Sequence, residues 1–123
     1  MVAGRPIEHV VRRSNGQALC DRCVVADSAP ARLRGLLGRR GLQQGEGLLL
    51  RPASSIHTAF MRFPIDAVFL DRDGVVLKVV ASLRPWQAAA ARRARAVLEL
   101  PAGECERHDL RAGEQLALEP RPA

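Results

Sequence analysis

The segment IDAVFLDRDGVVLKVVA, residues Ile65–Ala81, indicates the fold more clearly than any other part of the chain. Two runs rich in β-branched residues flank Asp71-Arg72-Asp73-Gly74, whose glycine can take the left-handed conformation that closes a tight turn. The segment is therefore predicted to form a β-hairpin. Both faces of Ile65–Leu70 are mostly apolar, which is typical of an interior strand, whereas Lys78 gives the second strand a partly polar face.

Further short strands are predicted on both sides of this hairpin, because apolar stretches recur between Gly, Pro, Asp and Ser residues. A succession of short strands separated by turns predicts a mainly β fold, either a jelly-roll-like sandwich or a partly closed barrel with one short helix. The predicted strands are Ala18–Ala26, Leu48–Arg51, Ser55–Met61, Val97–Leu100 and Gln115–Glu119, with a possible short one at His9–Arg12.

The helix is predicted over Pro30–Leu37. Ser28 can cap its N-terminus, and a proline suits the first turn because its missing N–H is not needed there. Leu33, Leu36 and Leu37 then fall on one helical face. We expect this face to pack a stripe of leucines against the core.

Two segments leave their secondary structure open. The alanine-rich composition of Leu83–Ala96 favours a helix, but Pro85 and the charged end of the segment fit a long surface loop equally well. Residues Glu104–Leu110 could form one helical turn.

A chain of 123 residues suits a single domain. We expect a loose N-terminal lead-in over residues 1–17, one β-rich domain over 18–119, and a tail over 120–123. No apolar run approaches the roughly 18 residues that cross a bilayer. Charged residues interrupt the N-terminal segment, so the sequence predicts no signal peptide and a cytoplasmic protein. The three cysteines do not suggest a framework of structural disulfides.

Three stretches in order resemble a known family: GLLGRRGLQQGEGLLL (Gly35–Leu50), IHTAFMRFPIDAVFLDRDGVVLKV (Ile56–Val79) and VLELPAGECERHDLRAGEQL (Val97–Leu116). Together they are similar to the domain-of-unknown-function 192 family, over about residues 24–118. The resemblance implies a mostly β, jelly-roll-like sandwich from bacteria or archaea, and it implies no activity. Many relatives carry a Trp-Met-Lys-Asn-Thr stretch where this chain has Phe60-Met61-Arg62-Phe63-Pro64.

Polar residues around the predicted hairpin form the first candidate site, which comprises His57, Thr58, Met61, Arg62 and Asp66. Asp66 interrupts an apolar strand, and a buried carboxylate needs a polar partner. Arg62 or Arg32 could pair with it, and the group could form the polar floor of a small pocket. The alternative, which we favour, is that Asp66 only accepts hydrogen bonds from backbone N–H groups near the Pro64 bend.

Glu99 also interrupts an apolar strand, and glutamate is rarely buried without a partner. Asp66 and Glu99 could act as an acid and base, or they could join His57 and His108 as metal ligands. Alternatively, Glu99 faces solvent or meets an arginine. The spacing of these residues is not diagnostic, so we expect no metal and no cofactor.

Two cysteine motifs are weaker candidates. In Cys20-Asp21-Arg22-Cys23, an offset of three residues would put the two thiols on opposite faces of a regular strand, which disfavours redox or zinc chemistry. In Cys105-Glu106-Arg107-His108, the thiol and imidazole could meet on a helical turn, but no third orienting group is visible.

The net charge is +6, and most of the basic residues are arginines. They form two runs: Arg32, Arg34, Arg39 and Arg40, and then Arg92, Arg93 and Arg95. A solvated basic face is the favoured explanation, because the few aromatic residues give little basis for a stacking platform. Nucleic acid is therefore an improbable partner and would be bound only non-specifically.

The sequence thus predicts non-catalytic binding of a small molecule or a partner protein. The expected site comprises His57, Thr58, Met61, Arg62, Asp66 and Glu99, with Trp86 on a flanking loop. A carboxylate-based, possibly metal-assisted hydrolase and a polyanion-binding accessory protein are the alternatives. No oligomeric state is predicted.

Overall fold

The structure is a computed structural model that describes residues 7–122, except the side chains of Leu33 and Arg34. The described residues are mainly β, as the sequence predicts, and no helix among them is long and apolar enough to cross a bilayer. The elements are β1 (Glu8–Arg13), β2 (Ala18–Ala26), α1 (Ala29–Arg34), β3 (Glu46–Leu50), β4 (Ser55–His57), β5 (Ile65–Leu70), β6 (Val76–Leu83), β7 (Ala88–Ala90), β8 (Ala96–Pro101), α2 (Glu104–Arg107) and β9 (Leu116–Pro120).

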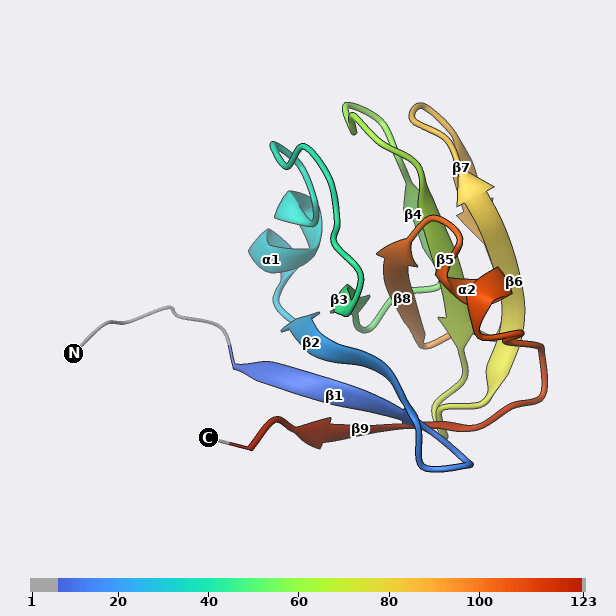
Figure 1. Cartoon of the computed structure of the whole chain (residues 1–123). Helices are drawn as coiled ribbons and strands as arrows, with labels where there is room; N and C mark the ends of the chain where they lie inside the picture. Colours follow the sequence, from blue (N-terminus) through green and yellow to red (C-terminus); the bar gives the residue numbers. More distant parts are fainter. Residues whose placement is uncertain (1–6, 123) are drawn as a thin grey trace.

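Seven strands form one sheet in the order β6-β5-β8-β3-β2-β1-β9, and β4 pairs with β7 in a separate two-stranded sheet. Neighbouring strands are antiparallel except β2 and β3, which run parallel and are connected through α1. Figure 1 shows that the large sheet is strongly bent, so that β1, β2 and β9 run across the direction of β5, β6 and β8. The result is sandwich-like, with one sheet folded over on itself.

The two outer strands of the large sheet meet at one end. An isolated bridge joins Val75 to Gln115, and the Leu116 N–H donates to the Gly74 carbonyl at 2.9 Å. Gly74 has φ +83°, and a Cβ added there would lie 2.4 Å from the Leu116 carbonyl oxygen. Only glycine therefore fits this contact without displacing the backbone.

The main hydrophobic core fills the inside of the bend. In β5 and β8, one set of alternating side chains faces inward, including Val68, Leu70, Leu98 and Leu100. The other set faces outward and is covered by α1, β4 and β7, which pack on residues such as Ile65. Both faces of these two strands are thus buried, which confirms that Ile65–Leu70 is an interior strand.

Asp66 lies on the inward face of β5 and is completely buried. Its Oδ1 accepts a hydrogen bond from the Ser82 N–H at 2.9 Å, at a bulge of β6. Its Oδ2 accepts from the N–H groups of Gly103 and Cys105, at 3.1 and 2.9 Å, where α2 begins. Asp66 therefore joins three parts of the fold through backbone groups, although at Ser82 and α2 rather than at the Pro64 bend.

Several sequence-based expectations need correction. Residues Glu8–Arg13 lie within the expected loose lead-in, but they form an interior strand that pairs with β2 and β9 and includes the possible strand at His9–Arg12. The helix α1 ends before Gly35, which has φ +45°, rather than at Leu37. The possible helical turn within Glu104–Leu110 is confirmed as α2, so the described residues contain two short helices rather than one. Leu83–Ala96 contains no helix, because it completes β6 and then forms β7.

The predicted strand Ser55–Met61 also ends early, at His57. The buried Thr58 that follows it is held by a distant loop. The Thr58 hydroxyl donates to the carbonyls of Arg84 and Gln87 and accepts from the Gln87 N–H. These bonds turn the chain out of the sheet, and Phe60 then takes a φ of 65°.

We predict that Gly74→Ala lowers the free energy of unfolding by more than about 2 kcal/mol. Alanine is strained at this left-handed φ, and its methyl group would collide with the Leu116 carbonyl oxygen. Urea unfolding followed by circular dichroism measures the change. Gly113→Ala is the matched control, since Gly113 has φ +97° with nothing within 4 Å of the added Cβ. Equal losses from the two variants would contradict the role assigned to the Gly74–Leu116 contact.

We predict that Asp66→Asn lowers the free energy of unfolding by about 2–4 kcal/mol, because the amide nitrogen replaces an acceptor for buried N–H groups. The measurement is again urea unfolding. Asp73→Asn, at an exposed turn position, should change stability little. A loss below about 1 kcal/mol for Asp66→Asn would show that these hydrogen bonds do not hold β6 and α2 in place.

Candidate functional site

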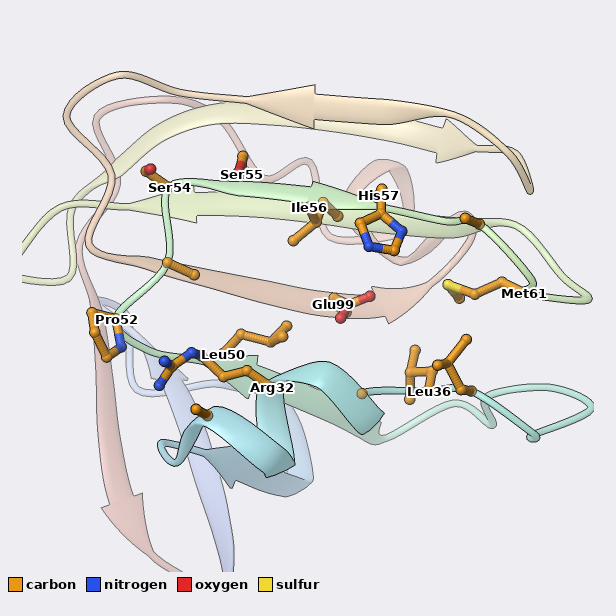
Figure 2. Close-up of a pocket in the computed structure, with 15 residues that line it drawn as sticks. Arg32, Leu36, Leu50, Pro52, Ser54, Ser55, Ile56, His57, Met61 and Glu99 are labelled. Carbon is orange, nitrogen blue, oxygen red and sulfur yellow. The ribbon is translucent and has the colours of Figure 1, made fainter.

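A cavity of about 500 Å³ lies on the outward face of the large sheet. Its walls come from α1 and the turn after it, from the end of β3, from β4, and from Glu99 on β8. Figure 2 shows β4 on one side of this space and α1 on the other. The volume is in the range of pockets that hold small organic ligands.

Glu99 projects into this cavity from β8. It lies opposite Leu48 of β3 and Ala67 of β5, so its side chain points outward while Leu98 and Leu100 point into the main core. The residue is only 5% exposed, and Figure 2 shows its carboxylate directed into the space between α1 and β4. Burial raises the pKa of Glu99 from its ordinary 4.5 to about 7.

The Glu99 carboxylate makes no hydrogen bond or ion pair with any side chain or backbone group that the structure describes. The Glu99 oxygens are also not among the side-chain atoms that are both inaccessible to solvent and without a hydrogen-bond partner. Its oxygens are therefore available to a molecule that enters the cavity. A buried carboxylate in this condition is unusual, because the desolvation of its charged form is not offset by the protein.

Arg32 supplies a second charge to the same cavity. Its Nη1 donates weakly to the backbone carbonyls of Asp27 and Arg51, at 3.3 and 3.4 Å. No ion pair between Arg32 and Glu99 is present, and only burial shifts the pKa of Glu99. In Figure 2 the guanidinium lies at one end of the cavity, beside Pro52, and away from the Glu99 carboxylate.

The remaining walls combine apolar surface with a few polar groups at the mouth. Leu36, Leu50 and Met61 are buried, and Ile56 is half-buried beside them. His57 is exposed, and its ring points toward Glu99 in Figure 2, while Ser54 and Ser55 lie where β4 begins. Such a lining suits a ligand with an apolar body and a small number of polar or charged groups.

The structure brings together three of the residues that the sequence singled out: His57, Met61 and Glu99 line one cavity. Thr58 is adjacent in sequence, but its hydroxyl is used entirely to hold the Arg84–Gln87 loop. Arg62 is exposed and does not line the cavity, and it does not pair with Asp66.

Asp66 and Glu99 cannot act as an acid and base pair. In the pairing of β5 with β8, Asp66 lies opposite Leu100 and Ala67 lies opposite Glu99, so the two carboxylates project from opposite faces of the sheet. For the same reason, they cannot share a metal with His57 and His108. Among the side chains that the structure describes, no group of three or more His, Cys, Asp or Glu residues could hold a metal ion.

Trp86 lies outside the cavity, on the loop between β6 and β7. It is 66% exposed and packs against Phe60, which is 71% exposed, with ring centroids 4.7 Å apart. Both residues have φ 65°, and the backbone N–H of Trp86 donates to the Thr58 carbonyl at 3.0 Å. The aromatic pair therefore joins the loop after β4 to the loop between β6 and β7, and neither ring lines the cavity.

The cysteines are arranged differently from the expectation for a regular strand. A bulge in the β1–β2 pairing sets Asp21 and Arg22 opposite Val10, and it brings the thiols of Cys20 and Cys23 together in the main core. Their expected placement on opposite faces is thus wrong. The Cys23 thiol donates to the Cys20 sulfur, and this hydrogen bond together with burial raises the pKa of Cys23 while it lowers the pKa of Cys20.

The proposed pairing of Cys105 with His108 has no support in the geometry. Cys105 is buried, and burial together with the nearby Asp66 carboxylate raises the pKa of its thiol. His108 instead lies against Glu104, with Nε2 and Oε2 3.6 Å apart. In the first arginine run, Arg39 forms an ion pair with Glu46 at 3.0 Å, so this run is not a uniformly free basic face.

Sequence reasoning did not assign Arg32, Leu36 and Leu50 to the same site as Glu99. The sequence places Arg32 in the first arginine run and makes it a possible partner for Asp66, which lies on the other face of the sheet. The leucine pattern did predict an apolar helix face against the core, and Leu36 is buried there. Which strand that face would meet depends on the parallel β2–β3 crossover, for which the sequence has no local signal.

Two solved structures are similar to this chain along nearly its whole length. One is a protein from Sinorhizobium meliloti 1021 with a provisional description as a transcription regulator; it is 21% identical, has a TM-score of 0.80, and the match covers 96% of this chain and 97% of that one. The other is a protein of unknown function from Novosphingobium aromaticivorans DSM 12444, with 22% identity, a TM-score of 0.77 and coverage of 94% of both chains.

None of the curated proteins matches the chain. Residues 10–118 match the sequence profile of DUF192, a family described as "Uncharacterized ACR". The match covers most of the described residues, including every strand from β2 to β8 and both helices. The chain belongs to the domain-of-unknown-function 192 family.

Proposed function

We propose that this protein binds a small organic molecule, without transforming it, in the cavity centred on Glu99. The bound molecule has an apolar body and at least one positively charged or hydrogen-bond-donating group. The observation that carries the proposal is the buried Glu99 carboxylate, which has no hydrogen-bond or ion-pair partner among the described residues and is directed into a cavity of about 500 Å³. A ligand that donates to this carboxylate satisfies the group that the fold leaves open.

The apolar walls support the same proposal. Leu36, Leu50, Ile56 and Met61 offer a surface from which a ligand of moderate size would displace water. A methionine among leucines also adapts its shape to different partners, because its side chain is unbranched and flexible. These features favour recognition of an apolar body in addition to the charged group.

Binding is favoured over catalysis because Glu99 lacks a second carboxylate in the cavity. The paired-carboxylate hydrolase requires Asp66, which projects from the other face of the sheet. His57 is within the same lining, but no group among the described residues orients its imidazole by a hydrogen bond. A nucleophile, an orienting group and an anion-stabilising pocket do not occur together here.

We predict that the stability of the protein depends on pH through Glu99. In the unfolded chain Glu99 loses its proton near pH 4.5, whereas in the folded protein it holds the proton to about pH 7. The folded state therefore binds more protons over this interval, and the contribution of Glu99 to stability falls as pH rises from 4.5 to 7. The expected loss is about 2–3 kcal/mol.

Urea unfolding of the wild type and Glu99→Gln, at about pH 5 and about pH 8, measures this contribution as the difference between the two proteins. The variant should gain stability relative to the wild type at the higher pH. Glu106→Gln, which replaces an exposed glutamate, serves as the control and should give no such difference. A constant difference between wild type and Glu99→Gln across the interval would mean that Glu99 is not buried as a free acid.

We also predict that the cavity binds ammonium compounds through Glu99. In a thermal-shift screen, compounds that carry a primary ammonium group on an apolar body, with or without a second charge, should raise Tm more than their neutral alcohol analogues. Isothermal titration of the best compound should show that Glu99→Gln weakens binding by at least about tenfold.

Glu106→Gln is again the matched control and should leave the affinity unchanged. If no compound binds in a manner that depends on Glu99, the proposed function is wrong. Binding that survives Glu99→Gln but is lost on Leu50→Ala would also contradict it, because the carboxylate would then have no part in recognition.

A further inference from the structure

We infer that the ligand of the Glu99 cavity is bipolar: it carries a cationic group for Glu99 and an anionic group for Arg32, joined by an apolar spacer. This inference rests on the proposed function and specifies the class of molecule that the site accepts. It concerns molecules such as ω-amino acids, in which an ammonium and a carboxylate are separated by a hydrocarbon chain.

Two opposite charges face one cavity without pairing. Glu99 and Arg32 both line it, yet no ion pair joins them, and Arg32 does not contribute to the pKa of Glu99. In Figure 2 the guanidinium lies near Pro52, away from the Glu99 carboxylate, so the two groups are held apart. Each charge is therefore left for a separate group of opposite sign.

Arg32 also retains hydrogen-bonding capacity. Only its Nη1 bonds to described groups, through long contacts of 3.3 and 3.4 Å to the carbonyls of Asp27 and Arg51. The Nε and Nη2 donors make no hydrogen bond with any part of the chain that the structure describes. These two N–H groups form one edge of the guanidinium, and this edge suits a carboxylate or another planar anion.

Apolar surface separates the two charges. In Figure 2 the side chain of Leu50 lies between the guanidinium of Arg32 and the carboxylate of Glu99, and Ile56 faces it from β4. A ligand whose two charges lie on adjacent carbons could pair with only one of the two side chains, Glu99 or Arg32. A hydrocarbon spacer follows this surface and displaces water from it.

Simpler ligands fit the same lining less well. A divalent cation would find a single carboxylate in the cavity and would be repelled by Arg32. An anion without a cationic group would gain Arg32 but would have to enter beside the Glu99 carboxylate. A molecule with both charges in the correct order compensates each pole at once.

Isothermal titration with three compounds of equal chain length tests the inference: ε-aminocaproate, hexylamine and hexanoate. The titrations are made at about pH 8, where Glu99 is mostly ionised. We expect ε-aminocaproate to bind at least about tenfold more tightly than either single-charge compound. Glu99→Gln should abolish its advantage over hexanoate, and Arg32→Gln should abolish its advantage over hexylamine.

Two further variants serve as controls. Arg62→Gln removes an exposed arginine that does not line the cavity, and it should leave all three affinities unchanged. Arg32→Lys keeps a positive charge in place and should retain part of the preference for ε-aminocaproate over hexylamine, even if Arg32→Gln perturbs the fold. Circular dichroism confirms that each variant is folded before titration.

The outcomes separate this inference from the proposed function. If hexylamine binds as tightly as ε-aminocaproate and its binding depends on Glu99, the proposed function stands and the bipolar ligand is wrong. If Arg32→Gln leaves the preference for ε-aminocaproate intact, Arg32 is not the anionic pole's partner and the inference is also wrong. If none of the three compounds binds, the inference fails, and the wider ammonium screen decides the proposed function.

Discussion

Strands β5 and β8 are covered on both faces, and this burial constrains every polar side chain that they carry. Asp66 on the inward face meets the constraint with three backbone N–H groups, and it thereby ties β5 to β6 and α2. Glu99 on the outward face has no such partners among the described residues, and a cavity lies in front of it. Two acids in similar apolar strands thus have different surroundings, because they project from opposite faces of the sheet.

Much of the fold follows from local sequence patterns. The alternation and β-branched content of Ile65–Ala81 predicted the central hairpin, and the strand Ala18–Ala26 was predicted with its observed bounds. Errors arose where a distant contact overrides local preference. Thr58 ends β4 because its hydroxyl bonds to the Arg84–Gln87 loop, and the alanine-rich segment after Leu83, for which the sequence left a helix or a surface loop open, pairs as β7.

The candidate site was predictable only in part, for a related reason. A charged residue within an apolar strand is visible in the sequence, so both Asp66 and Glu99 could be identified as unusual. Period-two alternation within each strand, however, does not specify how β5 and β8 align, and that alignment puts the two acids on opposite faces. A bulge has the opposite effect in β2, where it brings Cys20 and Cys23 to the same side despite their odd spacing.

The junction between Gly74 and Leu116 also bears on self-association. Sheet edges expose unpaired N–H and C=O groups, which can recruit strands from other molecules and lead to aggregation. Here the two outer strands, β6 and β9, satisfy part of each other's hydrogen bonding where they meet. Elsewhere a bulge at Ser82, the charged Lys78 and the terminal Pro120 interrupt those edges. The bent sheet thus offers few continuous stretches on which a second copy could add a strand.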